Sequence, residues 1–254
     1  MIKVYVINLA RATERWEHIC RQLKPLRDCV DIRRFDAVDG RNESHPLFER
    51  YDDSISKRWK GSSLSQGQLG CFASHYLVWQ ECLRVNEPVI VLEDDAVLMR
   101  EQLRRFIDQI PALHTRFECL RLFRNHSKHH QAWPVETIGT AQVVKYTKGP
   151  MRGTGYYLTP VAAKKFLDAS AIWFLPVDMT MDRFWQNKVE CYGVMPPIIS
   201  NEPTLESTIG YELRRQKKGL TVKFFRELFA IRELVGKHWC NTAFWISFFF
   251  RKRY

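Results

Sequence analysis

The apolar positions near the start of the chain follow two different periods. The run KVYVINL at residues 3–9 is short and rich in β-branched residues, which is typical of a buried strand. Helical spacing follows in ERWEHICRQL at residues 14–23, with Thr13 as the expected N-cap, and residues 31–38 again read as a strand. Strand, helix and strand at this spacing predict a parallel βαβ unit and an α/β fold.

The middle of the chain carries the clearest helix pattern. Residues 41–64 are polar and irregular, so we expect a loop there. Ser65 and Gln68 then have the spacing of a capping box, and the helix that they open is apolar almost all round. Such a helix should be mostly buried. The run Val89–Leu92 follows it and predicts a central strand.

The next hundred residues give weaker signals. A helix over Glu101–Ile110 should end before Pro111, and Thr159-Pro160 should open another helix. The other expected elements are strands over Leu120–Phe123 and Ala141–Lys145, a polar loop over residues 124–133, and a short helix over Asp178–Asn187.

Residues 211–254 mix basic and aromatic residues. Within them Trp239–Phe250 is largely apolar, but its 12 residues are fewer than the roughly 20 that a helix needs to cross a bilayer. Lys237 on one side and residues 251–253 on the other are basic, which favours a helical segment lying in the interface of an anionic membrane. The alternatives are a helix packed on the domain and a contact between copies of the chain.

The bulk composition narrows the class of partner. Lys and Arg exceed Asp and Glu by 39 − 28 = 11, which favours anionic partners such as nucleic acid, phosphorylated substrates or a membrane surface. The basic aromatic tail could stack on nucleic acid, but no recognised nucleic-acid motif is present, so we expect no such partner. Seven cysteines without a CxxC pair argue against a disulfide framework or a cysteine zinc site. The first residues lack the apolar run of a signal peptide, so we expect a cytoplasmic protein.

Three consecutive acids, Glu93-Asp94-Asp95, follow the predicted central strand. Ligands of open α/β sheets bind outside the carboxyl ends of the strands, where this triplet should lie. Adjacent anions repel one another unless a cation compensates them, and carboxylate oxygens suit Mg²⁺ or Mn²⁺. A metal ion there could stabilise a diphosphate leaving group. The alternative is a solvated end of a strand.

Several short blocks in a fixed order resemble one known family. Together they span residues 2–209 and comprise Val6–Leu9 with the following 10–15, Gly70–His75, the acid triplet, Arg152–Pro160 and Pro176–Asp178. This ordered set resembles glycosyltransferase family 25, the bacterial lipooligosaccharide biosynthesis glycosyltransferases related to the collagen galactosyltransferases.

The resemblance implies a GT-A fold, a Rossmann-like mixed sheet flanked by helices, over residues 1–210, followed by the 211–254 segment. It also implies an inverting transferase that moves a hexose, galactose before glucose, from a UDP-sugar. The family's DxD-type metal motif is here Glu93-x-Asp95. We therefore expect Asp95 to bind Mn²⁺ (or Mg²⁺) directly, with Glu93 as a second ligand and Asp94 helping to hold metal, ribose or sugar.

The same resemblance implies the donor site. The expected donor-binding residues are Asn8, Leu9, Arg11, Arg15, Ser74, His75, Glu93, Asp94, Gly153 and Thr154. Arginine suits phosphate through its forked donors, and small residues let the backbone approach a ligand closely. The alternatives are an ordinary helix start for the arginines, a core histidine for His75 and a simple bulge at the glycines.

Asp178 and Asp182 are the candidate catalytic residues. They are four residues apart, so on a helix they share one face. An inverting transfer needs one base for the acceptor hydroxyl, and Asp178 is favoured because it ends a family block. The alternative for Asp178 is a helix cap. His126, His129 and His130 are expected in an acceptor-side loop rather than in a metal site.

The expected function is therefore transfer to a lipid-linked oligosaccharide of bacterial lipooligosaccharide or lipopolysaccharide. The protein would work on the cytoplasmic face of the inner membrane, held by residues 211–254 on its anionic surface. Two alternatives stay open. One is a different metal-dependent enzyme that handles phosphate, and the other is a non-catalytic membrane-associated partner that kept the fold.

Overall fold

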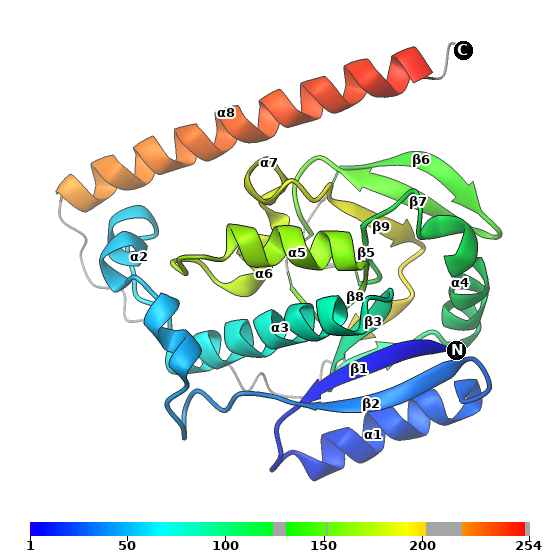
Figure 1. Ribbon diagram of the computed structural model, residues 1–254. Coiled ribbons are helices and arrows are strands. Elements are labelled where there is room, and N and C mark those ends of the chain that lie inside the picture. Colours follow the sequence, from blue (N-terminus) through cyan, green and yellow to red (C-terminus); the bar gives the residue numbers. More distant parts are fainter. Residues whose placement is uncertain (124–130, 151, 202–219, 252–254) are drawn as a thin grey trace.

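An eight-stranded mixed sheet forms the centre of the molecule. The computed structural model describes residues 1–123, 131–150, 152–201 and 220–251 (Figure 1). In sheet order the strands are β2 (Val30–Asp36), β1 (Ile2–Asn8), β3 (Val89–Glu93), β8 (Gly155–Leu158), β5 (Cys119–Arg121), β9 (Tyr192–Met195), β7 (Ala141–Tyr146) and β6 (Ala132–Ile138). Beside it, β4 (Ala96–Leu98) pairs antiparallel with β10 (Ile199–Asn201).

Helices cover the sheet. They are α1 (Thr13–Leu23), α2 (Asp53–Trp59), α3 (Gln66–Val85), α4 (Arg100–Leu113), α5 (Pro160–Ala169), α6 (Val177–Asp182), α7 (Phe184–Asn187) and α8 (Leu220–Arg251), with 3₁₀ turns at Lys24–Leu26 and Pro46–Arg50.

The parallel part of the sheet sets the position of the site. β1 pairs in parallel with both β2 and β3, so Asn8 lies opposite Asp36 and Ile7 lies opposite Glu93. The carboxyl ends of these three strands therefore meet at one edge, where open α/β sheets bind their ligands. The predicted βαβ unit and the expected fold class, a Rossmann-like mixed sheet flanked by helices, are confirmed.

Successive side chains of β1 point to opposite faces of the sheet and pack in two different hydrophobic cores. Val4 and Val6 pack in the core formed with α1 and α4, whereas Tyr5 and Ile7 pack in the core formed with α3 and α5. Full burial of each large apolar side chain contributes roughly 1.5–3 kcal/mol. Both faces of the parallel strands are thus fixed, and the polar residues at their ends are held in a defined register.

The buried helix α3 forms as predicted. Ser65 and Gln68 make both bonds of the capping box, and Asn86 in the left-handed conformation ends the helix. Two sides of the helix make apolar contacts. Phe72 stacks on Trp173 at 4.2 Å between ring centroids, and Val78 lies in the core under the sheet. The helix therefore brings Cys71 and His75 under the edge of β3.

Several predicted boundaries are wrong. The stretch 41–64 holds the 3₁₀ turn Pro46–Arg50 and α2, whose first turn is capped by Asp52 accepting from Ile55 N at 2.9 Å. Thr13 is the first residue of α1 and caps nothing, because Ala12 occupies the N-cap position. In both places short polar segments gave too little periodicity to locate a helix end.

Two helix ends also differ from the prediction. α4 continues through Pro111 to Leu113, because the fully buried Leu113 packs in the core and outweighs the one backbone bond that proline removes. The expected helix Asp178–Asn187 is broken at Arg183 into α6 and α7. The strands β4, β6, β9 and β10 were not predicted, and β6 begins inside the expected loop 124–133.

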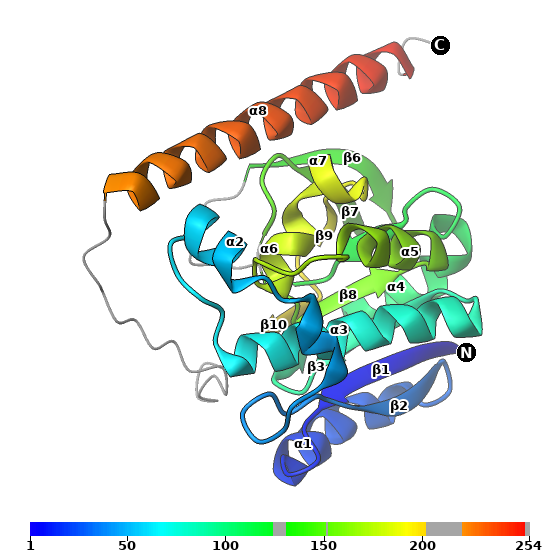
Figure 2. The same cartoon turned by 60° about the vertical axis from the view of Figure 1, so that its left-hand side comes forward.

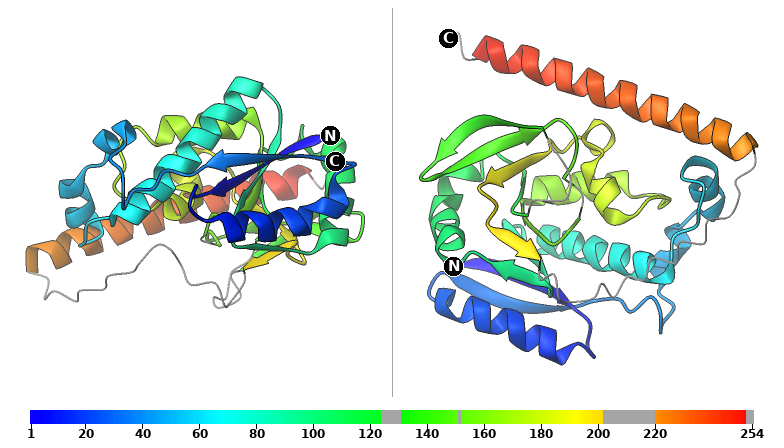
Figure 3. Two further views of the ribbon diagram at one scale, coloured as in Figure 1. Left: turned by 90° about the horizontal axis from the view of Figure 1, so that it is seen from below. Right: turned by 180° about the vertical axis from the view of Figure 1, so that it is seen from behind.

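The C-terminal helix α8 lies across one side of the domain, opposite β1, β2 and α1 (Figures 2 and 3). Trp59 of α2 packs on Phe229 at 5.5 Å between centroids, and Arg183 pairs with Glu233 at 2.7 Å. The expected helical segment is confirmed, and one of its faces packs on the domain. No helix in the described ranges is long and apolar enough to span a membrane.

Some expectations concern residues that are not described. The domain boundary between residues 210 and 211 lies outside the described residues, and so do His126, His129 and His130. These predictions stay as they were made.

Candidate functional site

Asp94 is the anchored member of the acid triplet. Asn8 Nδ2 donates to Asp94 Oδ2 at 2.7 Å, and Arg15 Nη1 donates to Oδ1 at 3.2 Å. Burial raises the pKa of Asp94, while the hydrogen bond from Asn8 and the charge of Arg15 oppose that shift. Both carboxylate oxygens are engaged, so Asp94 joins the ends of β1 and β3 and gives the triplet its orientation.

Asp95, unlike Asp94, has a carboxylate oxygen that is not hydrogen-bonded within the described residues. This oxygen, Oδ1, is buried. Burial, followed by the negative charges of Glu93 and Asp94, raises its pKa to about 7. A buried carboxylate without a partner is costly, and a bound cation would supply what is missing. The donor set and this orphaned oxygen fit the expected Mn²⁺ or Mg²⁺.

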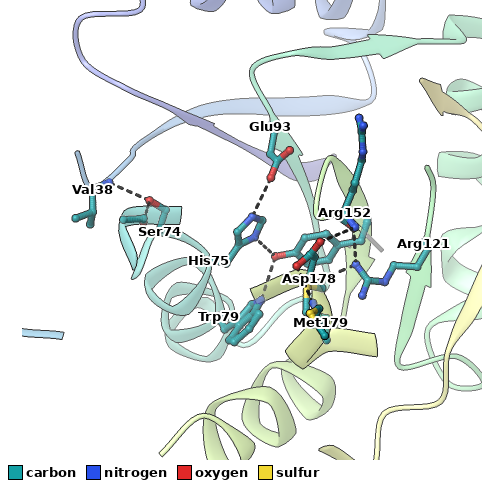
Figure 4. Close-up of polar contacts among 12 residues, drawn as sticks. Val38, Ser74, His75, Trp79, Glu93, Arg121, Arg152, Asp178 and Met179 are labelled. Carbon is teal, nitrogen blue, oxygen red and sulfur yellow. Dashed lines mark hydrogen bonds and ion pairs between the residues drawn. The ribbon is translucent and has the colours of Figure 1, made fainter. Parts of the chain in front are cut away.

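Glu93 is held on one side only. His75 Nε2 lies 3.3 Å from Glu93 Oε1, and the other ring nitrogen of His75 lies 2.9 Å from the Tyr156 hydroxyl (Figure 4). The same hydroxyl accepts from Trp79 Nε1 at 3.0 Å. His75 is thus a buried histidine with both nitrogens in use, and through Glu93 it reaches the edge of the site.

Cys71 shows which acids lie together. Burial raises the pKa of its thiol well above the usual value, and the charges of Glu93, Asp178 and Asp95 raise it further. The charges of these three carboxylates therefore act on one thiol. Asp178 also accepts from the backbone N of Arg152, whose neighbour Gly153 lies against Glu93, so Asp178 is on the same side of the site as the acid triplet. Cys71, His75 and Glu93 could offer ligand atoms within 4.8 Å of one another, but both ring nitrogens of His75 are already hydrogen-bonded.

The two aspartates of α6 differ in their surroundings. Arg121 Nη2 donates to Asp182 Oδ1 at 2.8 Å, and both residues are buried, so the charge of Asp182 is compensated inside the protein. Asp178 is half-buried, and within the described residues it accepts only from backbone, from Met179 N at 2.8 Å and Arg152 N at 3.3 Å. It does not occupy the N-cap of α6, which is Pro176.

The segment before β8 closes over the end of β3. Glu93 N donates to the Thr154 carbonyl at 2.9 Å. A Cβ atom on Gly153 would lie 2.9 Å from His75 Nε2 and 3.3 Å from Glu93 Oε1, so only glycine fits without displacing them. Arg152 adopts a left-handed conformation at φ 69°, and its charge lowers the pKa of Asp95.

Three predicted donor residues are occupied elsewhere. Ser74 Oγ accepts from Val38 N at 2.9 Å and donates to the Gly70 carbonyl at 2.8 Å, which ties α3 to the segment after β2. Arg11 pairs with Asp39, and the carbonyl of Leu9 accepts from Arg34. None of these contacts involves the acid triplet, and the donor roles of all three residues remain predictions.

A cavity of about 530 Å³ lies beyond the end of β2 and beside the start of α3. Its lining consists of residues 40–44, Phe48, Tyr51, Gln66 and Leu69. It follows the strand whose last residue pairs with Asn8, so this edge of the sheet offers room for a small molecule.

Sequence reasoning missed Arg121, Tyr156 and Trp79. Tyr156 and Trp79 sit within apolar runs and look like core residues. The usable signal was Arg121, because a charged residue inside the apolar strand CLRLF needs a buried partner.

Comparison with known proteins places this geometry in a family. The profile of "Glycosyltransferase family 25 (LPS biosynthesis protein)" matches residues 1–181. The chain is 25% identical over 212 residues to the lipooligosaccharide biosynthesis protein lic2B of Haemophilus influenzae, covering 79% of this chain and 76% of that protein.

Two longer relatives match only in part. A procollagen lysyl hydroxylase and glycosyltransferase of Acanthamoeba polyphaga mimivirus is 26% identical over 229 residues, which cover 78% of this chain and 24% of the viral protein. The human inactive glycosyltransferase 25 family member 3 is 30% identical over 189 residues, covering 69% of this chain and 30% of that protein. The matched blocks include the acid triplet and Asp178, and the chain belongs to glycosyltransferase family 25.

Proposed function

We propose that this chain is an active, metal-dependent, inverting glycosyltransferase that moves a hexose, galactose before glucose, from a UDP-sugar to an acceptor hydroxyl. The observation that carries the proposal is the buried oxygen of Asp95 beside Glu93 at the end of β3, which has no partner in the part of the chain that the structure describes. Asp95 and Glu93 would hold Mn²⁺ or Mg²⁺. When bound there, the ion supplies positive charge that stabilises the departing diphosphate.

Asp178 is the base in this proposal. Its charge acts on the same thiol as those of Glu93 and Asp95, and among the described residues no cationic side chain pairs with it. It can therefore take the proton of an acceptor hydroxyl, within the part of the site that the structure describes. Asp182 is paired with Arg121 and serves to hold α6 in place.

The proposed acceptor is a lipid-linked oligosaccharide of lipooligosaccharide or lipopolysaccharide. The Haemophilus relative is named a lipooligosaccharide biosynthesis protein, which supports this class of acceptor, since the chain covers 76% of that protein. Such an acceptor is anchored in a membrane, so the enzyme would work at the cytoplasmic face of the bacterial inner membrane.

The outer face of α8 supports work at a membrane. Apolar side chains three, four or seven residues apart form one stripe turned away from the domain, and each is between 47% and 77% exposed. This outer stripe consists of Phe224, Leu228, Ile231, Val235, Trp239, Ile246 and Phe249. The opposite face packs on the domain through Phe229 and Glu233, so the helix lies flat.

Charge favours lipid over a second copy as the occupant of the outer stripe. Lys223 and Arg232 are exposed on α8, and the whole chain carries a formal charge of +11. A twofold contact would bring identical positive surfaces together, whereas anionic headgroups attract them.

UDP release from a panel of UDP-sugars tests the proposed activity. Turnover of one donor with Mn²⁺ and acceptor extract is expected, with loss on adding EDTA and in Asp95→Ala. Asp36→Asn is a matched control, because Asp36 ends β2 at the same edge but is exposed. Absence of turnover for every donor in the folded wild type would instead support a non-catalytic role, as the name of the human relative suggests for that protein.

A further inference from the structure

Trp79, Tyr156, His75 and Glu93 form a continuous chain of hydrogen bonds from the core to the site (Figure 4). The direction of each bond follows from the chemistry of the groups. Trp79 Nε1 can only donate, so the Tyr156 oxygen accepts at its 3.0 Å contact. Tyr156 is fully buried, and its own hydroxyl proton has one recorded acceptor within the described chain, His75 Nδ1 at 2.9 Å.

The contact between His75 and Glu93, at the other end of these hydrogen bonds, also requires His75 Nδ1 to accept and Nε2 to donate. If His75 carried its proton on Nδ1, the lone pair of Nε2 would face the Glu93 carboxylate across 3.3 Å. The Tyr156 proton would then be buried without an acceptor, which costs roughly 1–3 kcal/mol. With the proton on Nε2, His75 accepts from Tyr156 and donates to Glu93, and every group is satisfied.

We propose that Trp79 and Tyr156 are positioning residues that fix the His75 proton on Nε2, so that His75 holds Glu93 Oε1 and leaves Oε2 for the cation. This deepens the proposed function, on which its last step rests. It also assigns three different duties to the acid triplet. Asp94 has both oxygens engaged, Glu93 has one, and Asp95 Oδ1 has no partner in the described structure.

Gly153 shields the hydrogen bond between His75 and Glu93. A Cβ atom there would lie 2.9 Å from both Cε1 and Nε2 of His75, so the backbone passes directly against the imidazole. His75 is only 1% exposed. A hydrogen bond in such a dry environment is stronger than one in water and holds Glu93 more firmly. Supporting bonds of this kind change metal affinity by about 10–100-fold when they are removed.

The tautomer can be measured without metal or substrate. In ¹⁵N NMR of the full chain with labelled histidine, His75, assigned by its loss in His75→Gln, should carry its proton on Nε2. In Tyr156→Phe the preference should weaken, and the Mn²⁺ dissociation constant measured by EPR should rise about tenfold or more. Tyr157→Phe is the matched control, because the neighbouring Tyr157 hydroxyl is buried without a partner in the described residues. It should change neither quantity.

A second pair of variants guards against misfolding of Tyr156→Phe. The variant His75→Gln keeps an N–H donor for Glu93 and should bind Mn²⁺ more tightly than His75→Leu. A wild-type His75 protonated on Nδ1 or on both nitrogens would overturn the proposal, and so would equal Mn²⁺ affinity in the Gln and Leu variants. Absence of Mn²⁺ binding in the wild type would sink the proposed metal and the duty assigned to Glu93, while the NMR result still decides the tautomer.

Discussion

Arg121 and Asp182 form a buried ion pair, with 2.8 Å between Nη2 and Oδ1, directly behind the segment that carries Arg152. Breaking a buried pair by removing one partner leaves an uncompensated charge, which costs roughly 3–5 kcal/mol. Asp182→Ala should therefore lower the free energy of unfolding by about that amount in urea titrations at pH 7. The double variant Arg121→Met/Asp182→Leu should recover most of the loss. A loss well under 1 kcal/mol in Asp182→Ala would contradict a structural role.

Asp178→Asn should have the opposite profile. Asparagine keeps an oxygen that can accept from Met179 N, so the melting temperature should stay close to that of the wild type. The side chain can no longer take a proton, and turnover should fall about 10²–10⁴-fold. Steady-state UDP release beside a thermal melt checks both expectations. If Asp182→Asn, corrected for its folded fraction, lost turnover while Asp178→Asn kept it, the two roles would be reversed.

The pKa of Asp95 predicts how metal-free stability depends on pH. Burial and the neighbouring acids raise this pKa to about 7, whereas an aspartate in the unfolded chain titrates near about 3.9. Between these values the folded state keeps a proton that the unfolded state has released. The contribution of Asp95 to stability is therefore fully present below about pH 4 and is lost as the pH rises through about 7.

Urea unfolding of EDTA-treated protein at pH 5 and pH 8 measures this effect. Asp95→Asn should lose less stability than the wild type between the two pH values, and Asp36→Asn should behave like the wild type. Since Mn²⁺ must displace the proton of Asp95, its affinity for the wild type should be higher at pH 8 than at pH 5. Identical pH dependence in Asp95→Asn and wild type would show that Asp95 titrates normally.

The outer stripe of α8 predicts binding to anionic vesicles. Cosedimentation with vesicles that contain phosphatidylglycerol should exceed that with neutral vesicles and should weaken with added salt. Val235→Asp places a charge on a residue that is 62% exposed and should reduce binding at least several-fold. Ile172→Asp is the control, because Ile172 is equally apolar and 54% exposed but lies outside α8. Concentration-dependent dimers that Val235→Asp abolishes, without vesicle binding, would identify a second copy as the occupant.

The local sequence pattern correctly predicts the elements whose formation depends little on contacts with distant residues. The βαβ unit shows its alternating periods, and α3 shows its period and its capping box, within about twenty residues. Those local signals were sufficient to predict them. They were not sufficient for β6, because half of its residues are polar or exposed and it becomes a strand by pairing with β7. The predicted end of α4 at Pro111 was wrong because Leu113, in the last turn, packs in a core formed by residues distant in the sequence.

The site divides along the same line. The position of the acid triplet at a strand end could be predicted, because the apolar run before it is local. The separate duties of its members could not, since Asn8 reaches Asp94 across 86 positions and Tyr156 reaches His75 across 81. Likewise, Asp178 and Asp182 look equivalent in the sequence, but they differ in burial and in the pairing of Asp182 with Arg121, about sixty residues away.

The two faces of α8 have a practical consequence for anyone who shortens the chain to improve its behaviour in solution. Removal of the helix would take away the outer stripe, but it would also expose Trp59, Phe174 and Trp185, whose rings lie against its inner face. The guanidinium of Arg183, one position beyond α6, would lose Glu233 at the same time. A truncated protein would therefore lose one exposed apolar surface and gain another. The helix that carries Asp178 would also lose the support of α8. Charged substitutions along the outer stripe are the better way to improve solubility.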